Sequence, residues 1–431
     1  MDWYTADRIF VGNAFCANLS LGIEHGMIRQ ISDSVATGVK PVNFSGCAIF
    51  PGTVNTHAHS FHSLLRGQGD DLPLLKWLYD VVYRHSANLT IEQAYLGAAL
   101  AYAEMLKNGI TTVVDFFYLN GLGNNYAQAT IRAATDLGIR LTLARTFMDW
   151  DKAPPTIRET LEVARRRYRE LAEAYQEHPL VRVCPAAHSA YAASPAMVAE
   201  AKRTAEEFNT KWHMHVADSA GSERQIRALF GCSTIRHLEK SKLLDGRLVA
   251  VHSVYVDPSE AEILGRARVS VSHNPSANMF LGDKAAPILE LKREAVTVGL
   301  GTDSGLDNNS LSIFHEMKIA ALVQKSTAGN PEAITAPELI EMATENGGQI
   351  AEWPVGRLAP GHAADFIVID CSDLALVPGD RLASHIVYSM SDRAIRSVYV
   401  NGKCVVRDRQ LVGIEEQELI QRVHAATRSM F

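Results

Sequence analysis

The sequence is poor in cysteine and has no cysteine motif. Six cysteines occur in 431 residues, and none belongs to a CxxC pair or to another spacing typical of metal ligands. Scattered cysteines in a long chain predict reduced thiols and a cytoplasmic protein, because disulfides persist in oxidising compartments. The start, MDWYTADRIFVGNAF, has no basic segment followed by an apolar one, and no run of about 18 apolar residues occurs. We therefore expect neither a secretion signal nor a membrane span.

The sequence also has no excess of positive charge. Its formal net charge is -6 at pH 7, and its densest basic run, at 165–169, is flanked by glutamates. Such a chain lacks the basic field that attracts nucleic acid or anionic lipid. Hydrophobic residues make up 47% of the chain and charged residues 21%, so the chain can bury a large core. The partners we expect are a small-molecule substrate and other copies of this chain, in a dimer or a higher oligomer.

Short segments rich in β-branched residues alternate with long amphipathic stretches through the middle of the chain. We count eight such segments, at 48–50, 111–114, 141–144, 181–184, 212–216, 248–251, 269–272 and 296–300. The stretches between them carry apolar residues at helical spacing, and two of them begin at the capping residues Thr90 and Ser194. Eight strand–helix units predict a closed (β/α)8 TIM-type barrel, with a doubly wound open sheet as the alternative.

The two ends of the chain have a different pattern, made of short alternating strands and turns. Glu24-His25-Gly26 is a turn signal near the start, and Asn401-Gly402 is a hairpin signal near the end. We expect both ends to pair into one small β-sandwich. The predicted organisation is the N-terminal part of the sandwich at 1–50, the barrel at 51–354, and the C-terminal part of the sandwich with a terminal helix at 355–431.

Histidines fall at the ends of the predicted barrel strands, where the chemistry of such barrels gathers. The strand-end residues are His57, His59, His188, His215, His252, His273 and Asp303. Alternate residues of an extended segment point to the same side, so His57 and His59 can bind one ion. With His215 and Asp303 they provide three nitrogens and one oxygen. This set suits one divalent ion, zinc or else ferrous iron, and leaves a position for water.

Longer motifs surround these residues. They are PGTVNTHAHS at 51–60, LLRGQGDDLPLLKWL at 64–78, His215-x-x-Asp218, His252, SHNPSANMFLG at 272–282, GTDSGLDNN at 301–309 and VGRLAPGHAADFIVID at 355–370. These motifs resemble the amidohydrolase superfamily. The sequence is most similar to the branch of methylthioadenosine/S-adenosylhomocysteine deaminases, guanine deaminases and triazine hydrolases. The resemblance extends nearly from end to end and implies a barrel with a small β-sandwich.

The resemblance also implies a role for individual residues. The implied metal ligands are His57, His59, His215 and Asp303. His252 would polarise the departing group or the attacking water, and His188 would contact the substrate. A bound divalent metal lowers the pKa of its water toward about 7, and Asp303 could accept the proton as the resulting hydroxide attacks.

The sequence departs from that branch at two places. Asp218 stands where relatives usually have a glutamate that carries a proton from the water to a ring nitrogen, and it is one methylene shorter. It predicts either a proton shuttle with shifted substrate placement or a carboxylate that only orients its neighbours or faces solvent. The stretch 84–90 lacks the carboxylate that holds the ribose hydroxyls in the nucleoside deaminases. We therefore expect a substrate that does not need a ribose.

Three further features are candidates around the site. His62 stands where purine and triazine relatives often have a glutamine facing the substrate, although a surface or helix-capping histidine is the alternative. Arg145, after the third predicted strand, could meet an anionic group of the substrate. Residues 307–309 are expected to orient the loop that carries Asp303.

The resulting hypothesis is a metal-dependent aminohydrolase of a small planar aminated N-heterocycle, of purine, pterin, pyrimidine or triazine type. A metal-bound hydroxide would attack the ring and ammonia would leave. The alternatives among hydrolases are a deiminase of formimino or guanidino compounds and a triazine chlorohydrolase. A non-catalytic binding barrel is the alternative from another class, and the presence of all four predicted ligands argues against it.

Overall fold

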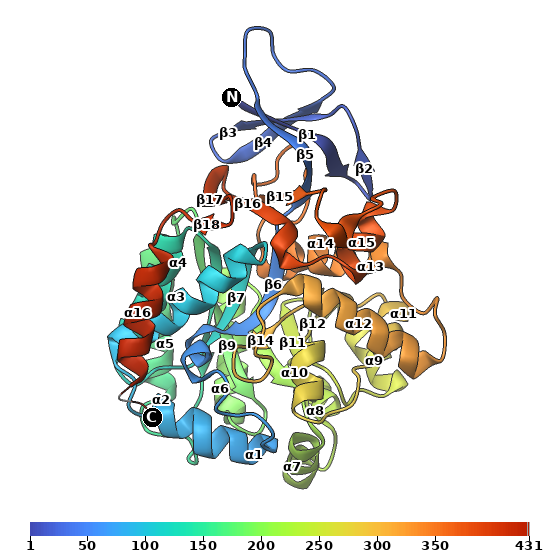
Figure 1. Ribbon diagram of the computed structural model, residues 1–431. Coiled ribbons are helices and arrows are strands. Elements are labelled where there is room, and N and C mark those ends of the chain that lie inside the picture. The colour runs from blue at the N-terminus through green and yellow to red at the C-terminus, as the bar shows by residue number, and fades with distance from the viewer. Residues whose placement is uncertain (429, 431) are drawn as a thin grey trace.

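The computed structural model describes residues 1–428 and 430, which form two separate nine-stranded sheets (Figure 1). One sheet is the wall of a barrel, and the other contains strands from both ends of the chain. In Figure 1 the terminal sheet lies above the barrel, while helices α1 (Leu74–Lys76) and α7 (Ala220–Phe230) lie at the opposite end. The predicted barrel with a small β domain from both termini is confirmed.

The barrel strands are all parallel; β6 to β13 each pair with their neighbours in sequence, and β14 pairs with β6. They are β6 (Thr53–His59), β7 (Ile110–Phe117), β8 (Arg140–Phe147), β9 (Val181–Ser189), β10 (Trp212–Val216), β11 (Leu248–His252), β12 (Ser270–His273), β13 (Thr297–Leu300) and β14 (Asp303–Ser304). Every residue of β6, β7, β8 and β10 is buried, as expected for strands covered on both faces. Because parallel strands end at the same rim, their last residues meet at one end of the barrel.

The barrel closes where β14 pairs with the end of β6. Asn55 and Thr302 hold this seam with two hydrogen bonds: Asn55 Nδ2 donates to Thr302 Oγ1 at 2.7 Å, and the Thr302 N–H donates to Asn55 Oδ1 at 3.0 Å. A Cβ at Gly301 would lie 2.2 Å from Asn274 Oδ1 and 3.0 Å from the His57 nitrogen. Glycine therefore allows the last strand to approach the first beside the predicted metal ligands.

Helices cover the outside of the barrel. They are α3 (Ile91–Lys107), α4 (Asn125–Leu137), α5 (Leu161–Tyr175), α6 (Pro195–Phe208), α7, α8 (Thr234–Lys240), α9 (Pro258–Arg266), α10 (Pro275–Phe280), α11 (Ile288–Arg293), α12 (Ile313–Ala328), α13 (Ala336–Ala343) and α14 (Glu345–Ala351). The predicted caps are confirmed: Thr90 forms a capping box with Gln93, and Ser194 accepts a hydrogen bond from the Met197 N–H. The segment between β6 and α3 consists of four short elements: η1 (Ser60–Leu65), α1, η2 (Trp77–Tyr83) and α2 (Arg84–Ser86).

The terminal sheet has the strand order β18-β17-β16-β15-β5-β1-β3-β4, with β2 beside β1. Its strands are β1 (Asp2–Val11), β2 (Ala14–Cys16), β3 (Ser20–Glu24), β4 (Met27–Ser32), β5 (Val42–Pro51), β15 (Phe366–Asp370), β16 (Ile395–Val400), β17 (Lys403–Arg407) and β18 (Gln410–Leu411). Its side chains form a core of their own. The two predicted turns are confirmed, since His25, Gly26, Asn401 and Gly402 all have positive φ angles between paired antiparallel strands. Between β15 and β16, α15 (Leu382–Tyr388) packs near α12 and α13, and after the sheet α16 (Glu416–Thr427) lies along α3 (Figure 1).

The sequence interpretation is wrong about the first barrel strand. Residues 48–50 belong to β5, which pairs with β1 and β15 in the terminal sheet, and the barrel begins with β6. Only Gly52 separates β5 from β6, and both strands are buried around it, so the hydrophobic pattern shows no break. A Cβ at Gly52 would lie 2.1 Å from the Thr111 side chain, which explains why glycine stands where the chain passes from one sheet to the other.

A buried ion pair joins the terminal sheet to the barrel. Arg140, the first residue of β8, donates from Nε and Nη2 to the two carboxylate oxygens of Asp365, both at 2.9 Å. The two side chains are 2% and 0% exposed, and Asp365 also accepts the Asn401 N–H at 2.7 Å. This pair fixes the sheet against the amino ends of the barrel strands, so the rim with the strand carboxyl ends stays open.

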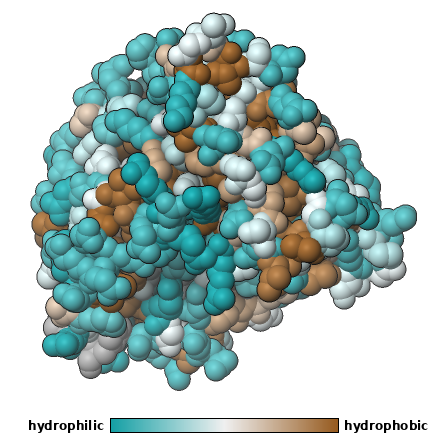
Figure 2. Space-filling model, turned by 45° about the horizontal axis from the view of Figure 1, so that its top comes forward, coloured by the Kyte–Doolittle hydropathy of each residue, from teal (hydrophilic) through white to brown (hydrophobic). Residues whose placement is uncertain are grey.

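The visible surface is mixed in character. Figure 2 shows several separate hydrophobic patches between hydrophilic residues on the face that carries the terminal sheet. No helix in residues 1–428 is long and apolar enough to cross a membrane.

Candidate active site

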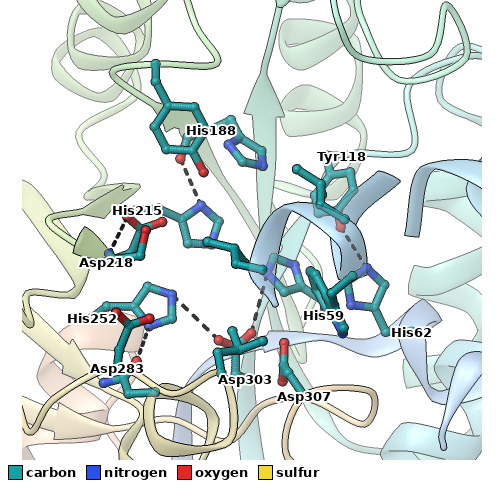
Figure 3. A pocket seen from close by; sticks show the side chains of 17 residues that line it. His59, His62, Tyr118, His188, His215, Asp218, His252, Asp283, Asp303 and Asp307 are labelled. Carbon is teal, nitrogen blue, oxygen red and sulfur yellow. Dashed lines mark hydrogen bonds and ion pairs between the residues drawn. The ribbon is translucent and has the colours of Figure 1, made fainter. Parts of the chain in front are cut away.

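A pocket opens at the carboxyl ends of the barrel strands and contains about 630 Å³ of space, part of it open to solvent (Figure 3). Its lining combines aromatic and aliphatic side chains with imidazoles and carboxylates from several strands. The predicted residues that line it are His59, His62, His188, His215, Asp218, His252 and Asp303. The fold therefore brings together side chains that are separated by up to about 245 positions in sequence, with His57 directly beside them.

The four predicted metal ligands belong to two overlapping groups that share His57. Asp303 Oδ1 lies 3.5 Å from His57 Nε2 and 3.6 Å from His59 Nε2. The ligand atoms of these three residues lie within 4.8 Å of one another, and the same holds for His57, His215 and His252. All five side chains are buried. Three or four of these groups form the kind of nitrogen and oxygen set that binds zinc.

Backbone carbonyls fix the orientation of two of these imidazoles. His59 Nδ1 donates to the Phe116 carbonyl at 2.7 Å, and His215 Nδ1 donates to the His188 carbonyl at 2.8 Å. A carbonyl oxygen only accepts, so in neutral imidazoles each Nε2 carries a lone pair directed into the site. Neither ring nitrogen of the fully buried His57 has a hydrogen-bond partner among the residues that the structure describes. A bound cation would satisfy this imidazole, so the residues present fit a metal ion.

The backbone leaves the β region where the site residues occur. His252 has φ 73° and Asp303 has φ 56°, both in the left-handed region that side chains other than glycine rarely adopt. Such conformations cost free energy and gather at functional sites. His252 is the last residue of β11 and Asp303 is the first residue of β14. Their backbone conformations direct both side chains toward the same point, where His252 Nε2 lies 3.6 Å from Asp303 Oδ2.

The pKa values follow from burial and from this crowding. Burial lowers the pKa of His57, His59 and His215, so these imidazoles are neutral, the form that binds metal. Burial alone would raise the pKa of Asp303, but the imidazole of His57, followed by those of His252 and His59, outweighs burial and holds that pKa well below its usual range. Asp303 is therefore ionised throughout the neutral range.

His252 is held by the side-chain amides of Asn274 and Asn278, which follow β12. Its Nδ1 donates to Asn278 Oδ1 at 2.8 Å, and Asn274 Nδ2 lies 3.2 Å from the same nitrogen. In the neutral ring, Nε2 then carries the lone pair and faces Asp303. This imidazole can accept a proton from a group placed between it and Asp303.

Asp218 lines the pocket at the start of α7 and is only partly buried. Its Oδ1 accepts hydrogen bonds from the Ser219 N–H, at 2.8 Å, and from the Ser222 hydroxyl. One carboxylate oxygen is thus used to orient the first turn of the helix. The Asp218 carboxylate also interacts with the Tyr191 hydroxyl across the pocket (Figure 3), so the geometry is compatible with both predicted roles of Asp218.

His62 and His188 both reach the pocket. His62 is fully buried, its Nε2 lies 2.7 Å from the Tyr118 hydroxyl, and burial lowers its pKa to about 3. His188 Nδ1 lies 3.2 Å from Ser189 Oγ, and burial lowers its pKa to about 4. Both are neutral hydrogen-bonding groups. The surface alternative for His62 is incorrect, because η1 turns inward beneath Trp77 and Tyr118.

Arg145 does not reach the pocket, contrary to the sequence interpretation. Its Nη2 donates to both carboxylate oxygens of Glu159 at 2.9 Å, and its Nε donates to Asn124 Oδ1 at 3.3 Å. The guanidinium is fully buried. Side chains alternate along a strand, and this position of β8 faces the layer of outer helices rather than the barrel interior. Arg145 therefore forms a structural ion pair, with Arg167 on the far side of Glu159.

Sequence reasoning missed several residues of the pocket. Asp283 lines it beside Asp218 and His252, and its Oδ1 accepts a hydrogen bond from the Tyr255 hydroxyl at 2.9 Å. Asp307, expected only to orient its loop, does accept the Ser304 N–H at 2.9 Å but also faces the pocket. Burial, with a contribution from Asp303, raises the pKa of Asp307 well above its usual range. Both residues are aspartates and so were visible as candidates in the sequence. They lie in loops, however, where no repeating pattern of apolar residues indicates which way a side chain points.

Comparison with known proteins agrees with this geometry. The family model described as "Amidohydrolase family" matches residues 48–405. The chain belongs to the amidohydrolase family. A 5-methylthioadenosine/S-adenosylhomocysteine deaminase of Syntrophobacter fumaroxidans is 32% identical to this amidohydrolase over 404 residues, 93% of this chain and 90% of the relative. A 5'-deoxyadenosine deaminase of Methanopyrus kandleri is 33% identical over 390 residues, 90% of this chain and 86% of the relative.

Solved structures share the fold of this amidohydrolase. A zinc-bound adenosine deaminase of Xanthomonas campestris superposes with a TM-score of 0.92 at 24% identity, covering 99% of this chain and 98% of that one. Atrazine chlorohydrolase of Arthrobacter aurescens, complexed with zinc, superposes with a TM-score of 0.93 at 23% identity, covering 99% and 100%. At these identities the likeness establishes the fold.

Proposed function

We propose that this amidohydrolase is a hydrolytic deaminase that uses one divalent metal ion, zinc in the first instance, to release ammonia from a small planar aminated N-heterocycle. One observation carries the proposal: His57, His59, His215 and Asp303 gather at a single point of an aromatic-lined pocket, beside the two further proton-transferring groups Asp218 and His252. The deaminase names of relatives at 32% and 33% identity support the reaction.

The metal would be held by the three imidazoles and by Asp303. When bound, such an ion lowers the pKa of a coordinated water toward about 7 and so supplies a nucleophile at neutral pH. The imidazoles are neutral and Asp303 is ionised, which are the protonation states that bind a metal ion. The Phe116 and His188 carbonyls fix the ring orientations of His59 and His215.

The remaining polar groups would move protons. Asp303 Oδ2 and His252 Nε2, 3.6 Å apart, can share the proton released as water attacks the ring carbon. The attacking water gives up two protons. Asp218 Oδ2 would carry one of them to a ring nitrogen, which makes the ring carbon more electrophilic and leaves an N–H in the product. The other would pass through Asp303 and His252 to the exocyclic amine, which departs as ammonia while the oxygen of the water stays on the ring carbon as a carbonyl.

The side chains that line the pocket support a planar substrate. Trp77 and Tyr118 line it with the neutral imidazoles of His62 and His188, which offer ring faces and hydrogen bonds. Ser86, in the stretch where nucleoside deaminases place their ribose-holding carboxylate, is 1% exposed and lies outside the pocket lining. We therefore propose a substrate without an obligatory ribose, although the relatives act on nucleosides by name.

An ammonia-release screen tests the proposal. Zinc-loaded protein is assayed on aminated purines, pterins, pyrimidines and triazines, with each base matched to its nucleoside where one exists. We expect turnover of at least one heterocycle, dependence on the metal, and no strong preference for the nucleoside. Formimino compounds and a chlorotriazine, assayed for ammonia and for chloride, cover the two other hydrolytic reactions. A protein that retains metal but releases nothing from any compound would contradict the proposal and favour a binding barrel.

A further inference from the structure

A buried carboxylate lies on the strand beside the predicted metal ligand His59. Asp115, on β7, is fully buried and forms no ion pair with any cation in residues 1–428. Among the described residues it belongs neither to the candidate ligand groups nor to the pocket lining. Because a buried carboxyl without a cation costs free energy, an apolar side chain of similar size would serve the stability of the fold better. The position of Asp115 beside the metal site indicates a function.

Three donors hold this carboxylate. Asp115 Oδ1 accepts the Ser60 N–H at 3.2 Å, and Oδ2 accepts the Ser60 hydroxyl and, at 2.5 Å, the Tyr102 hydroxyl. Burial raises the pKa of Asp115, whereas these hydrogen bonds lower it. Since only an ionised carboxylate accepts at both oxygens without a donor of its own, the arrangement fits the charged form. Two of the three bonds fix Ser60, the residue that directly follows His59.

Ser60 begins a turn that needs an external partner. The 3-10 helix η1 starts at Ser60 with His59 as its N-cap, and the His59 side chain makes no capping hydrogen bond. The first N–H groups of a helix have no partner within the helix, so this N–H must be satisfied from elsewhere. Asp115 satisfies it from the neighbouring strand. The direction in which the chain leaves His59 is therefore set by a side chain of β7.

The same strand also holds the imidazole of His59. Asp115 and Phe116 are consecutive residues of β7, and the Phe116 carbonyl accepts from His59 Nδ1 at 2.7 Å. The pairing of β6 with β7 is irregular between Asn55 and Ala58, and it resumes where Ala58 lies opposite Asp115. The ladder is therefore interrupted within the metal-binding segment, and the side chain of Asp115 adds an anchor at the carboxyl end of that segment.

Helix α3 supports this anchor from outside the barrel. Tyr102, which provides the third donor, belongs to α3 and is fully buried. A Cβ at Gly97, on the same helix, would lie 2.9 Å from the Phe61 carbonyl, so glycine lets α3 pack closely against η1. The elements η1, α3 and β7 thus form one packed unit around Asp115.

We propose that Asp115 is a positioning residue of the metal site: through Ser60 it fixes the turn after His59, and so sets the direction of this ligand toward the ion. The inference rests on the proposed function, because it takes a divalent ion to bind at the four predicted ligands. Asp115 is not itself a ligand and acts through the backbone that carries one. Groups that orient a ligand in this way contribute about 10- to 100-fold to metal affinity or activity.

Metal affinity tests the inference without turnover. The zinc dissociation constant of the full chain is measured by competition with a chromogenic chelator, and the visible spectrum of the cobalt-loaded protein reports the geometry of the ligands. Asp115→Ala removes all three hydrogen bonds, so we expect the zinc dissociation constant to rise by about 10- to 100-fold and the cobalt bands to shift. Asp115→Asn keeps an oxygen for the Ser60 N–H and should recover a large part of this loss.

A pair of tyrosine variants separates positioning from packing. Tyr102→Phe removes one donor to Asp115 and should raise the zinc dissociation constant by about three- to tenfold. Tyr168→Phe makes the same change on α5, where an equally buried phenol donates to the Val183 carbonyl of β9 at 3.2 Å. This second variant should keep a zinc affinity within about twofold of the parent, because its contact is remote from the site. The unfolding midpoints of the metal-free variants report the cost to the fold in each case.

The outcomes separate this inference from the proposed function. An Asp115→Ala protein that folds with the zinc affinity and the cobalt spectrum of the parent would overturn the inference. So would equal losses of zinc affinity in Tyr102→Phe and Tyr168→Phe, because general packing would then explain both. If Asp115→Ala does not fold, Asp115→Asn and the two tyrosine variants decide. Weakened zinc binding in a protein that deaminates no compound would support the positioning role and count against the deaminase, whereas ammonia release with unchanged affinity would do the opposite.

Discussion

The role of Asp218 gives the sharpest test of the proposed chemistry. Asp218→Asn keeps an oxygen that can accept from the Ser219 N–H and from the Ser222 hydroxyl, so the start of α7 should be preserved. The variant loses the ability of the second oxygen to accept and deliver a proton. Because Asp218 is not one of the proposed ligands, metal content should stay at the parent level.

The expected loss can be stated as a rate. Removal of a general acid or base lowers kcat by about 10²–10⁴, which corresponds to about 2.7–5.5 kcal/mol in the activation free energy. KM should change much less, since asparagine keeps the size of the side chain and an oxygen that can accept from its neighbours. The assay is steady-state ammonia release combined with metal analysis of the same preparation.

A neighbouring variant separates chemistry from structure. Ser222→Ala removes one hydrogen bond to Asp218 Oδ1 but leaves the carboxylate, so kcat should fall by less than about tenfold. An Asp218→Asn enzyme with normal metal content and a kcat within about threefold of the parent would refute the proton-shuttle role. The carboxylate would then be an orienting group, and proton transfer would fall to Asp303 and His252.

The other predictions concern the metal site, a buried carboxyl and the ion pair between the domains. His215→Ala should abolish both metal retention and turnover, whereas His237→Ala, on the outer helix α8, should retain both; full metal occupancy in the first variant would show that the ligand assignment is wrong. Burial raises the pKa of Glu316 from 4.5 to about 7, so the folded protein holds a proton that the unfolded chain releases between those values, and stability should fall as pH rises through this window. Glu316→Gln should match the parent at pH 5 and exceed it by up to about 3 kcal/mol at pH 8 in urea unfolding; a difference that does not change with pH would contradict this. Arg140→Met strands the buried Asp365 carboxylate and should cost about 3–5 kcal/mol, much of it regained when Asp365→Leu is added; an unchanged midpoint would contradict the buried pair.

The sequence could predict most of the metal site because its residues are tied to strand ends. His57, His59, His215 and His252 each follow or end a β segment, and parallel strands bring their carboxyl ends to one rim whatever the details of the helices. The structure places these side chains close together, as expected for residues at the carboxyl ends of neighbouring parallel strands. The HxH spacing adds a second constraint, since alternate residues of β6 share a side.

The remaining features depend on contacts that periodicity does not encode. The end of β5 and all of β6 are buried, and only Gly52 separates them, so their assignment to different sheets follows from pairing with β15 and β7, not from the local pattern. Arg145 directly follows a predicted strand, as several of the histidines do. Its side chain nevertheless lies on the outer side of β8, where it binds Glu159 in the loop before α5, so it points away from the pocket. Asp283 reaches the pocket only because the turn after α10 folds back on Asn278.

The seam between β6 and β14 has a consequence for how the protein is assembled. Asp303 pairs with Ala58, between His57 and His59, so ligands about 245 positions apart in the chain meet only where β14 joins β6. A ribosome-bound or truncated chain that ends before β14 therefore has no complete set of metal ligands. Metal uptake then reports that the ring has closed, and the free energy of binding adds to stability at the joint with the longest loop-closure entropy. The proposed ion would hold this joint closed, and removal of the metal should destabilise the barrel there first.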